Sequence, residues 1–331
     1  MSGEGSASVT QSSQPSVTRP SRRQGWRELQ GLAEVELADR REARWLIEFV
    51  AGARTPIAGA PTDAQRSLAH TLIARRRAGE PLQYVIGSWQ FRKLELLVDR
   101  RVLIPRPETE QVVEVALGQL HRLAEVTRRT SGSLPVLQVV DLGTGSGAIA
   151  LSVATEWPCS AGAGAGPEGR PSRRSSPLAD VEIWAVDRSS DAVEVAAANR
   201  ARLAEQFKSR VRLCQGDWWQ GLPGRLAGQV ALVVSNPPYI SSAEMAGVDP
   251  VVKDWEPREA LEAGPAGTEA HRAILVDAPR WLRPCGVVVL EIAPHQADEV
   301  TKIASRVGFA HVEVRPDLAG RPRVLVAAES L

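Results

Sequence analysis

Asp141-Leu142-Gly143-Thr144-Gly145-Ser146-Gly147 is the stretch of this sequence that decides the fold. It follows the apolar run Val136–Val140, which is typical of a buried parallel strand. It precedes Ala148–Thr155, whose pattern predicts a helix. Glycines allow a sharp turn and bring backbone N–H groups close to a ligand. A strand, a glycine-rich turn and a helix in this order predict a nucleoside-binding turn in an α/β domain.

The pattern continues to the end of the chain as an alternation of apolar strands and helices. Further strands are expected at Val181–Val186, Val211–Cys214, Val230–Val234, Val287–Ile292, His311–Val314 and Val324–Ala327. Helices are expected at Asp191–Phe207, Glu269–Leu282 and Gln296–Val307. This alternation predicts an open, mostly parallel sheet covered on both faces. Ligands of such sheets bind at the carboxyl ends of the strands, near the switch in strand order.

The sequence before this α/β domain predicts three further segments. Residues 1–22 are rich in Ser, Gly, Gln and Pro and are expected to form a disordered tail. Residues 23–80 predict a small helical domain, in which Thr62 is the expected N-cap of a helix. Residues 81–105 predict a hairpin linker built from short strands, including Tyr84–Gly87 and Val102–Ile104. The domain 106–331 begins with an expected helix over Glu108–Thr127, and its residues 160–178 are expected to be a flexible insertion.

An acidic residue ends the second expected strand of the α/β domain. The carboxylate of Asp187 is placed to accept both ribose hydroxyls of an adenosine. After the third strand, Trp218 is a candidate to pack on an adenine ring, and Asp217 is a candidate acceptor for its amine. These residues leave a dinucleotide and S-adenosylmethionine both open. The Gly-x-Gly-x-Gly spacing departs from Gly-x-Gly-x-x-Gly and disfavours NAD.

Asn236-Pro237-Pro238-Tyr239 ends the fourth expected strand. The two prolines stop the strand and donate no backbone hydrogen bond. The side-chain oxygen of Asn236 and the carbonyl of Pro237 can each accept one hydrogen of a planar NH2 group. Tyr239 supplies a ring on which that group can stack. Such a grip holds an amide or amine and, next to a nucleoside cofactor, predicts methyl transfer to nitrogen.

Composition narrows the possible partners. The 331 residues are 43% hydrophobic and 24% charged with a net charge of +1, so bulk charge favours neither a nucleic acid nor a membrane. The three cysteines are widely spaced, which fits a reducing compartment such as the cytoplasm. The five histidines show no ligand spacing, so no metal is expected. The expected state is a cytoplasmic monomer.

The chain resembles the HemK/PrmC family, the peptide chain release factor glutamine N5-methyltransferases, over about residues 25–331. Beside the glycine turn and Asn-Pro-Pro-Tyr, the resemblance rests on Pro81-Leu82-Gln83-Tyr84, Leu103-Ile104-Pro105-Arg106-Pro107-Glu108-Thr109-Glu110, Trp255-Glu256-Pro257, Ala260-Leu261 and Asp317-Leu318-Ala319-Gly320-Arg321-Pro322-Arg323. The Ile-Pro-Arg-Pro-Glu-Thr-Glu segment is the specific part, because adenine methyltransferases also contain Asn-Pro-Pro-Tyr. In this chain Ala293 stands where the family often has glycine.

The resemblance implies a seven-stranded Rossmann-like methyltransferase domain behind a helical substrate-recognition domain. It implies methylation, from S-adenosylmethionine, of the glutamine in the Gly-Gly-Gln motif of class 1 release factors. Cofactor binding is carried onto Gly143, Thr144, Gly145, Ser146, Gly147, Asp187, Trp218 and Asn236. Substrate binding is carried onto Asn236, Pro237, Pro238 and Tyr239, with Asn236, Pro237 and Tyr239 as the catalytic set. Arg106 and Glu108 would lie beside the site, where Arg106 could orient Glu108 or Glu110.

Three other functions remain open from the residues alone. An adenine-N6 methyltransferase acting on DNA or RNA would use the same grip, but it needs a basic track. A non-catalytic protein could keep the fold, although the intact motifs argue against it. An NAD-dependent oxidoreductase lacks the usual glycine spacing.

Overall fold

The computed structural model describes residues 24–52, 60–131, 136–158 and 179–329. The expected disordered tail and the expected insertion lie outside the described residues. The chain divides into two units, Met1–Gly79 and Glu80–Leu331. No helix in the described part of the chain is long and apolar enough to cross a membrane.

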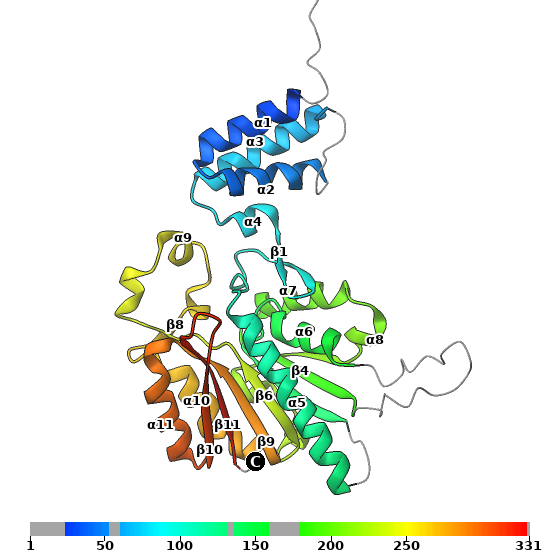
Figure 1. Ribbon diagram of the computed structural model, residues 1–331, viewed down its shortest axis with the longest axis vertical. Helices are drawn as coiled ribbons and strands as arrows, with labels where there is room; N and C mark the ends of the chain where they lie inside the picture. The colour runs from blue at the N-terminus through cyan, green and yellow to red at the C-terminus, as the bar shows by residue number, and fades with distance from the viewer. Residues whose placement is uncertain (1–23, 53–59, 132–135, 159–178, 330–331) are drawn as a thin grey trace, which may run out of the picture. The chain divides into compact units, whose positions relative to one another are not determined.

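The first unit is built from helices (Figure 1). They are α1 (Gln24–Leu37), α2 (Arg40–Ala51) and α3 (Asp63–Arg77). Asp39 caps α2, because its carboxylate accepts the N–H groups of Arg41 and Glu42 at 2.7 and 3.0 Å. Thr62 caps α3 as predicted: its hydroxyl accepts the N–H of Gln65 at 3.2 Å, and the Gln65 side chain returns the bond to the Thr62 N–H at 2.9 Å. Each cap satisfies backbone donors that the first helical turn leaves unpaired.

The second unit starts with a short helix and a hairpin. These are α4 (Leu82–Ile86), β1 (Ser88–Phe91) and β2 (Leu94–Leu97). The strand expected at Tyr84–Gly87 was therefore wrong, and Val102–Ile104 forms no strand either. A short apolar run fits a buried helix and a strand equally well. Here Gly87 ends the helix with a left-handed φ of 80°.

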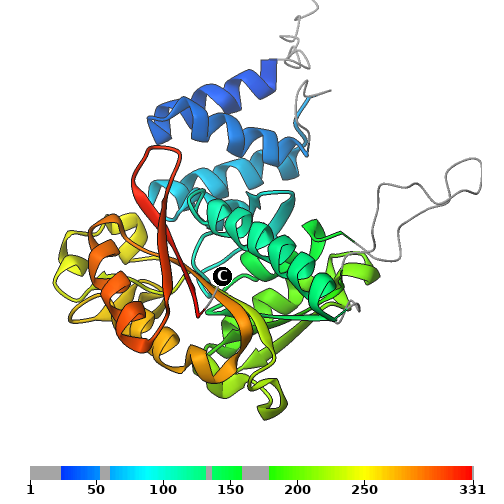
Figure 2. The same cartoon turned by 60° about the horizontal axis from the view of Figure 1, so that its bottom comes forward.

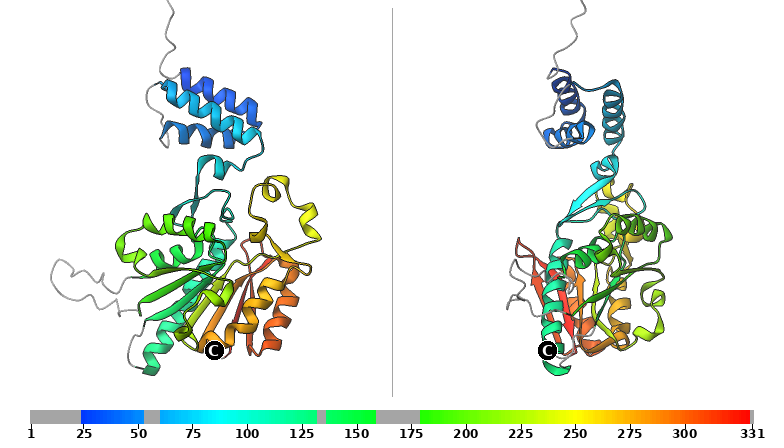
Figure 3. Two further views of the ribbon diagram at one scale, coloured as in Figure 1. Left: turned by 180° about the vertical axis from the view of Figure 1, so that it is seen from behind. Right: turned by 90° about the vertical axis from the view of Figure 1, so that its right-hand side faces the viewer.

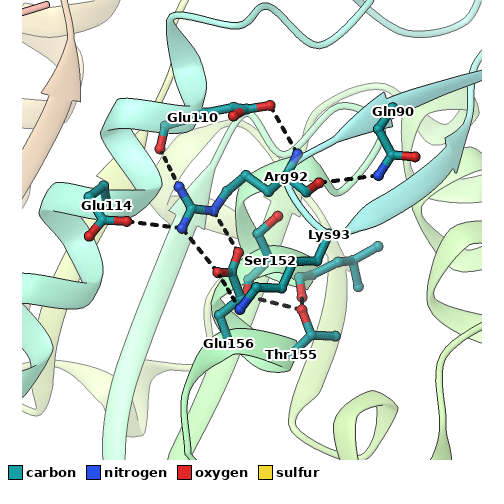
Figure 4. A network of polar contacts seen from close by, with 9 residues as sticks. Gln90, Arg92, Lys93, Glu110, Glu114, Ser152, Thr155 and Glu156 are labelled. Carbon is teal, nitrogen blue, oxygen red and sulfur yellow. Dashed lines mark hydrogen bonds and ion pairs between the residues drawn. The ribbon is translucent and has the colours of Figure 1, made fainter. Parts of the chain in front are cut away.

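Arg92, in the turn between β1 and β2, fastens this hairpin to two helices of the domain (Figure 4). Its guanidinium donates to both carboxylate oxygens of Glu156 at 2.5 and 3.0 Å, and to Glu114 at 3.0 Å. It also donates to the backbone oxygen of Glu110 at 2.9 Å, and the Arg92 N–H donates to the Glu110 side chain at 3.0 Å. Lys93 adds a 3.2 Å contact to Glu156. The hairpin is thus tied to α5 (Thr109–Ser131) and α6 (Ala148–Glu156).

The second unit is organised around a seven-stranded sheet of order β10-β11-β9-β6-β3-β4-β5, which confirms the predicted fold class. The strands are β3 (Leu137–Leu142), β4 (Val181–Asp187), β5 (Val211–Gln215), β6 (Val230–Ser235), β9 (Leu282–Glu291), β10 (His311–Pro316) and β11 (Pro322–Ala328). The pairs between β9 and β5 are parallel, and β11 runs antiparallel to both of its neighbours. Strands β10 and β11 form a long hairpin at one edge (Figure 2).

Helices cover both faces of the sheet (Figure 3). Alternate residues of a strand point to opposite faces, so Val139 packs in the core beneath α5 and α6, whereas Val140 packs beneath α10 and α11. The remaining α-helices are α7 (Ser190–Ala201), α8 (Glu205–Lys208), α9 (Pro250–Lys253), α10 (Glu269–Trp281) and α11 (Ala297–Val307). The continuous helix expected over Asp191–Phe207 is therefore split into α7 and α8. Shorter elements are β7 (Ile240–Ser241) and β8 (Glu262–Gly264), with 3₁₀ turns at Trp218–Gly221, Gly224–Leu226, Glu244–Gly247, Arg258–Ala260 and Pro294–Gln296.

The strand order reverses between β3 and β6. The chain runs from β3 outward through β4 and β5, and then returns to pair β6 on the other side of β3. Both strands end at the same level, because Asp141 lies opposite Val234 and the Ser235 hydroxyl donates to the Leu142 carbonyl at 2.5 Å. The fold therefore brings the turn that begins at Gly143 beside the turn that begins at Asn236.

We expect Arg92→Met to lower the free energy of unfolding by about 2 kcal/mol, because it leaves the Glu156 carboxylate, with a side chain only 7% exposed, without its main partner. Urea denaturation measures this loss. Arg129→Met is the matched control, since Arg129 is 72% exposed in its pair with Glu125 and should cost about 0.5 kcal/mol or less. Equal losses in the two variants would contradict the anchoring role.

Candidate functional site

A cavity of about 330 Å³ lies at the carboxyl ends of β3, β4, β5 and β6, within the second unit. It is the position at which a doubly wound sheet binds ligands. Seven of the candidates predicted from the sequence line it: Gly143, Gly145, Asp187, Asp217, Trp218, Asn236 and Pro238. The fold thus brings together residues from four strand ends that are separated by up to 95 positions along the chain.

The glycine turn and Asp187 are bonded directly to each other. The N–H of Gly145 donates to Asp187 Oδ2 at 2.9 Å, and the N–H of Ser189 donates to Oδ1 at 3.0 Å. Gly145 is in the left-handed region with a φ of 55°, a conformation that glycine adopts without steric cost. Burial is the largest influence on Asp187 and raises its pKa, while the two N–H donors oppose that rise. The carboxylate is therefore fixed in direction at the cavity wall.

A second carboxylate, Asp141, lies buried under the turn. Its Oδ2 accepts the hydroxyl of Thr144 at 2.7 Å and the N–H of Ala150 at 3.1 Å. Its side chain has no exposed surface, and burial raises its pKa to about 7. The carboxyl joins the turn to the first turn of α6 and so fixes the shape of the cavity floor.

The other three residues of the predicted cofactor set shape the turn from behind the cavity wall. Thr144 is committed to Asp141, and Ser146 accepts the side-chain amide of Asn199 on its backbone oxygen at 2.9 Å. Gly147 begins α6, and a β-carbon there would lie 2.9 Å from the side chain of Leu151. A larger residue at this position would be strained by the left-handed φ of 84° and would crowd the buried Leu151 side chain.

Trp218 closes one side of the cavity. It has a φ of 46°, which is unusual for a bulky side chain and marks a constrained position. Its ring lies 3.7 Å from the point where a β-carbon on Gly143 would stand. Asp217 also lines the cavity. The arrangement provides an aromatic surface and a carboxylate on the wall that faces the glycine turn.

Asn236 is the first residue after β6, and its carboxamide is held at one end only. Its Nδ2 group donates to the hydroxyl of Thr109 at 3.0 Å. The oxygen end has no protein donor among the residues that the structure describes. Pro238 lines the cavity, while Pro237 is buried. The Asn236 oxygen is thus available as an acceptor at the cavity.

Tyr239 lies beyond the cavity lining. Its backbone oxygen accepts the side-chain amide of Gln296 at 2.7 Å, and the same amide donates to the Gly267 oxygen at 3.0 Å. This bond fixes the path of the chain after the two prolines. Burial raises the pKa of the Tyr239 phenol, and the nearby Glu291 carboxylate adds to that rise. The phenol therefore stays protonated at neutral pH.

Arg106 pairs with Glu256, which corrects the expectation that it would orient Glu108 or Glu110. Its guanidinium donates to Glu256 Oε1 at 2.5 Å, and Oε2 accepts the backbone N–H of Ile104 at 3.1 Å. The segments on either side of this pair, residues 101–103 and 257–263, both contribute to the cavity lining. The ion pair therefore ties together two loops that form one wall of the site.

Four residues of this arrangement were not identified as site residues from the sequence: Thr109, Asn199, Glu256 and Glu291. Three of them stand in motifs quoted for the family resemblance or beside them, but their roles depend on partners 127 to 182 positions away. Asn199 gave a weaker signal, as a polar residue at a buried position of α7. It bonds the backbone N–H and carbonyl of Leu97 at 2.6 and 3.0 Å, and it joins the hairpin to the glycine turn through Ser146.

Known proteins resemble this chain over most of its length. Residues 29–87 match the family model described as the PrmC N-terminal domain. A release factor glutamine methyltransferase from Gloeobacter violaceus is 38% identical over 310 residues, which cover 91% of this chain and 95% of that protein. The release factor glutamine methyltransferase from Streptomyces coelicolor is 40% identical over 261 residues, which cover 78% of this chain and 80% of that protein.

A solved structure is also similar to the chain. The protein-(glutamine-N5) methyltransferase (release factor-specific) from Alicyclobacillus acidocaldarius is 26% identical, and the match covers 69% of this chain and 95% of that one with a TM-score of 0.36.

We expect Asp141→Asn to become more stable, relative to the unsubstituted protein, as the pH rises from about 4 to about 7. Folded Asp141 keeps its proton up to about pH 7, whereas the unfolded chain ionises near its ordinary value of 3.8. The stability that the protonated carboxyl contributes is therefore lost as the pH rises through this window, and asparagine has no proton to lose. Urea denaturation at several pH values measures the difference. Asp191→Asn, which replaces an exposed acid of α7, is the matched control.

Proposed function

The chain belongs to the release factor glutamine methyltransferases, and from this membership we propose that it transfers a methyl group from S-adenosylmethionine to the side-chain amide nitrogen, N5, of a glutamine in a class 1 peptide chain release factor. The target would be the glutamine of the Gly-Gly-Gln motif. One observation carries the proposal at the level of the site. The Asn236 carboxamide and the glycine turn stand side by side at the ends of β6 and β3 and face one cavity.

The residues at the cavity fit S-adenosylmethionine. Asp187, held by the Gly145 N–H, would accept the ribose hydroxyls, and Trp218 would cover the adenine beside Asp217. Thr144, Ser146 and Gly147 would act indirectly by holding the turn in shape. The Asn236 side would border the part of the cofactor that carries the reactive methyl. When bound, S-adenosylmethionine supplies a methyl group on a positively charged sulfur.

The chain's own residues would hold the substrate amide. Its two N–H groups would donate to the Asn236 oxygen and the Pro237 carbonyl, which directs the nitrogen lone pair into the cavity. The nitrogen held in this way would take up the methyl group, the bonding pair of electrons would stay on the sulfur, and the nitrogen would then give one proton to solvent. An amide nitrogen is a weak nucleophile, so fixed orientation and acceptors that do not need to reorganise must supply much of the rate. Pro238 and Tyr239 would complete the walls of this subsite.

The relatives favour this reaction over adenine-N6 methylation, since both are named for glutamine methylation of release factors. Under the proposal the partner is a protein, with neither nucleic acid nor membrane involved, and the reaction takes place in the cytoplasm on a monomeric enzyme. The helical unit would recognise the release factor, in keeping with the predicted role of residues 23–80.

Mass analysis of a release factor after incubation with the protein and S-adenosylmethionine tests the function. We expect a gain of one methyl group, located by fragmentation to the glutamine of Gly-Gly-Gln. A release factor in which that glutamine is replaced by alanine is the matched control and should gain none. Methylation of adenine in DNA or RNA, without methylation of the release factor, would refute the proposal.

We expect Asn236→Ala to lower kcat by roughly a hundredfold or more, because it removes an acceptor that is needed most in the transition state. The fold should persist, since the only described partner lost is the Thr109 hydroxyl. Steady-state kinetics with the release factor measures the change, and thermal unfolding checks the fold. A kcat close to that of the unsubstituted enzyme would show that the oxygen does not grip the substrate.

We expect the double substitution Phe49→Asp with Leu68→Asp to raise KM for the release factor about tenfold, a change that corresponds to a loss of ~1.4 kcal/mol of binding. Both side chains are exposed, at 43% and 42%, on α2 and α3, so the substitutions need not disturb the fold. Calorimetry should find S-adenosylmethionine binding unchanged. Val136→Asp, at an exposed residue before β3, is the control. An equal rise in KM for Val136→Asp would refute the assignment of release factor recognition to the helical unit.

A further inference from the structure

A chain of hydrogen bonds runs from the cavity into the core of the domain. The Asn236 Nδ2 group donates to Thr109 Oγ1 at 3.0 Å, and Thr109 Oγ1 donates to Glu291 Oε2 at 2.7 Å. The three residues come from different elements: Asn236 follows β6, Thr109 begins α5 and Glu291 ends β9. Thr109 and Glu291 are buried, at 4% and 1% exposure, and neither lines the cavity.

The direction of this chain follows from the chemistry of its middle member. A hydroxyl has one proton to donate. An ionised carboxylate only accepts, so Thr109 must give its proton to Glu291 and can only accept from Asn236. The 2.7 Å distance is typical of a hydroxyl bonded to a charged oxygen. The NH2 end of Asn236 therefore faces Thr109, and its oxygen end faces the cavity.

We propose that Thr109 and Glu291 are positioning residues that determine which end of the Asn236 carboxamide is presented to the substrate. The inference rests on the proposed function, in which Asn236 must offer an oxygen to an NH2 group. A carboxamide turned the other way would present hydrogens to hydrogens. The two ends have nearly the same shape, so packing alone discriminates poorly between them, whereas the hydrogen-bond chain does so by charge.

The surroundings of Glu291 make the direction sensitive to protonation. Burial raises the pKa of Glu291 to about 7, the Thr109 hydroxyl and the positive charges of Arg323 and Arg106 oppose that rise, and Glu108 adds to it. On the other sides, Tyr239 is a neutral phenol that belongs to the loop Asn236–Tyr239, here called the substrate loop, and His271 of α10 bonds the Glu291 backbone oxygen at 2.8 Å. Burial lowers the pKa of His271 to about 4, so this ring is neutral over the relevant range.

Protonation of Glu291 would reverse the direction of the hydrogen bonds from Glu291 through Thr109 to Asn236. A protonated carboxyl can donate to Thr109, which then has its own proton available for the Asn236 oxygen. The carboxamide would be stabilised in the turned orientation, with its NH2 end toward the cavity. The orientation with the Asn236 oxygen toward the cavity is therefore favoured as the pH rises through about 7, and it is lost as the pH falls.

The first test observes the bond itself, without any reaction. The side-chain amide signals of Asn236 in a ¹H–¹⁵N spectrum of the full chain are identified by their absence in Asn236→Asp. We expect these signals to shift in Thr109→Val and to move with pH around neutrality in the unsubstituted protein. Thr127→Val, which removes a buried hydroxyl from the other end of α5, should leave them in place. Unmoved signals in Thr109→Val would overturn the proposal, whether or not the protein methylates a release factor.

The second test uses kinetics with the release factor. We expect Thr109→Val to lower kcat roughly tenfold to a hundredfold, less than loss of the acceptor itself, with S-adenosylmethionine binding unchanged. Thr109→Ser keeps the hydroxyl and should restore most of kcat. If the Thr109 hydroxyl had only a structural role, Thr109→Val would change the unfolding temperature and not kcat. The unsubstituted enzyme should gain kcat with pH around neutrality, and Glu291→Gln should lack this rise. Because Asp141 titrates in the same range, the rise must also persist in Asp141→Asn.

The outcomes separate the two proposals. An unsubstituted protein that fails to methylate any Gly-Gly-Gln substrate refutes the proposed function, and the spectra then decide the inference alone. An active protein whose kcat is equal in Thr109→Val and Thr127→Val, at matched stability, refutes the inference and leaves the function intact. If the rise of kcat with pH disappears in Asp141→Asn but persists in Glu291→Gln, the titrating carboxyl is Asp141. That result also refutes the inference.

Discussion

The site depends on the adjacent, level endings of two parallel strands. β3 and β6 are neighbours in the sheet because the strand order reverses at this point, and the Ser235 hydroxyl joins their ends by donating to the Leu142 carbonyl. Both strands are buried on both faces, so their register is set by packing. A shift of one residue in either strand would turn every side chain to the opposite face and separate the glycine turn from Asn236.

Polar groups around the cavity are held by partners that the core supplies. Asp141 under the glycine turn and Glu291 under the substrate loop are both buried carboxyls that accept a threonine hydroxyl. Neither carboxyl lines the cavity, and each acts through its threonine: Asp141 through Thr144 on the glycine turn, and Glu291 through Thr109 on Asn236. A buried carboxyl is costly unless it is hydrogen-bonded or protonated. The fold accepts this cost at two places where a fixed hydrogen-bond direction controls how the wall meets a ligand.

The sequence was sufficient to predict what depends on local pattern. The strands and helices of the α/β domain follow from apolar periodicity, the Thr62 cap from residue type, and the placement of Asp187 at a strand end from the order of elements. Local pattern was not sufficient at Tyr84, where a short apolar run forms a helix. Contacts between residues that are far apart in the sequence were also not predicted. Arg106 has acidic neighbours at 108 and 110, yet it pairs with Glu256, and only the folded chain brings that partner within reach.

Two buried or half-buried asparagines show how the structure separates a functional amide from a structural one. Asn199 is bonded at both ends, since its oxygen accepts the Leu97 N–H and its nitrogen donates to the carbonyls of Leu97 and Ser146. Its three hydrogen bonds all serve the hairpin and the glycine turn. Asn236 is bonded at its nitrogen end, by a hydroxyl that has no proton left for the oxygen end. An amide that is fixed in direction and incompletely bonded is suited to grip another amide, because it offers an oriented acceptor whose partner must come from a ligand.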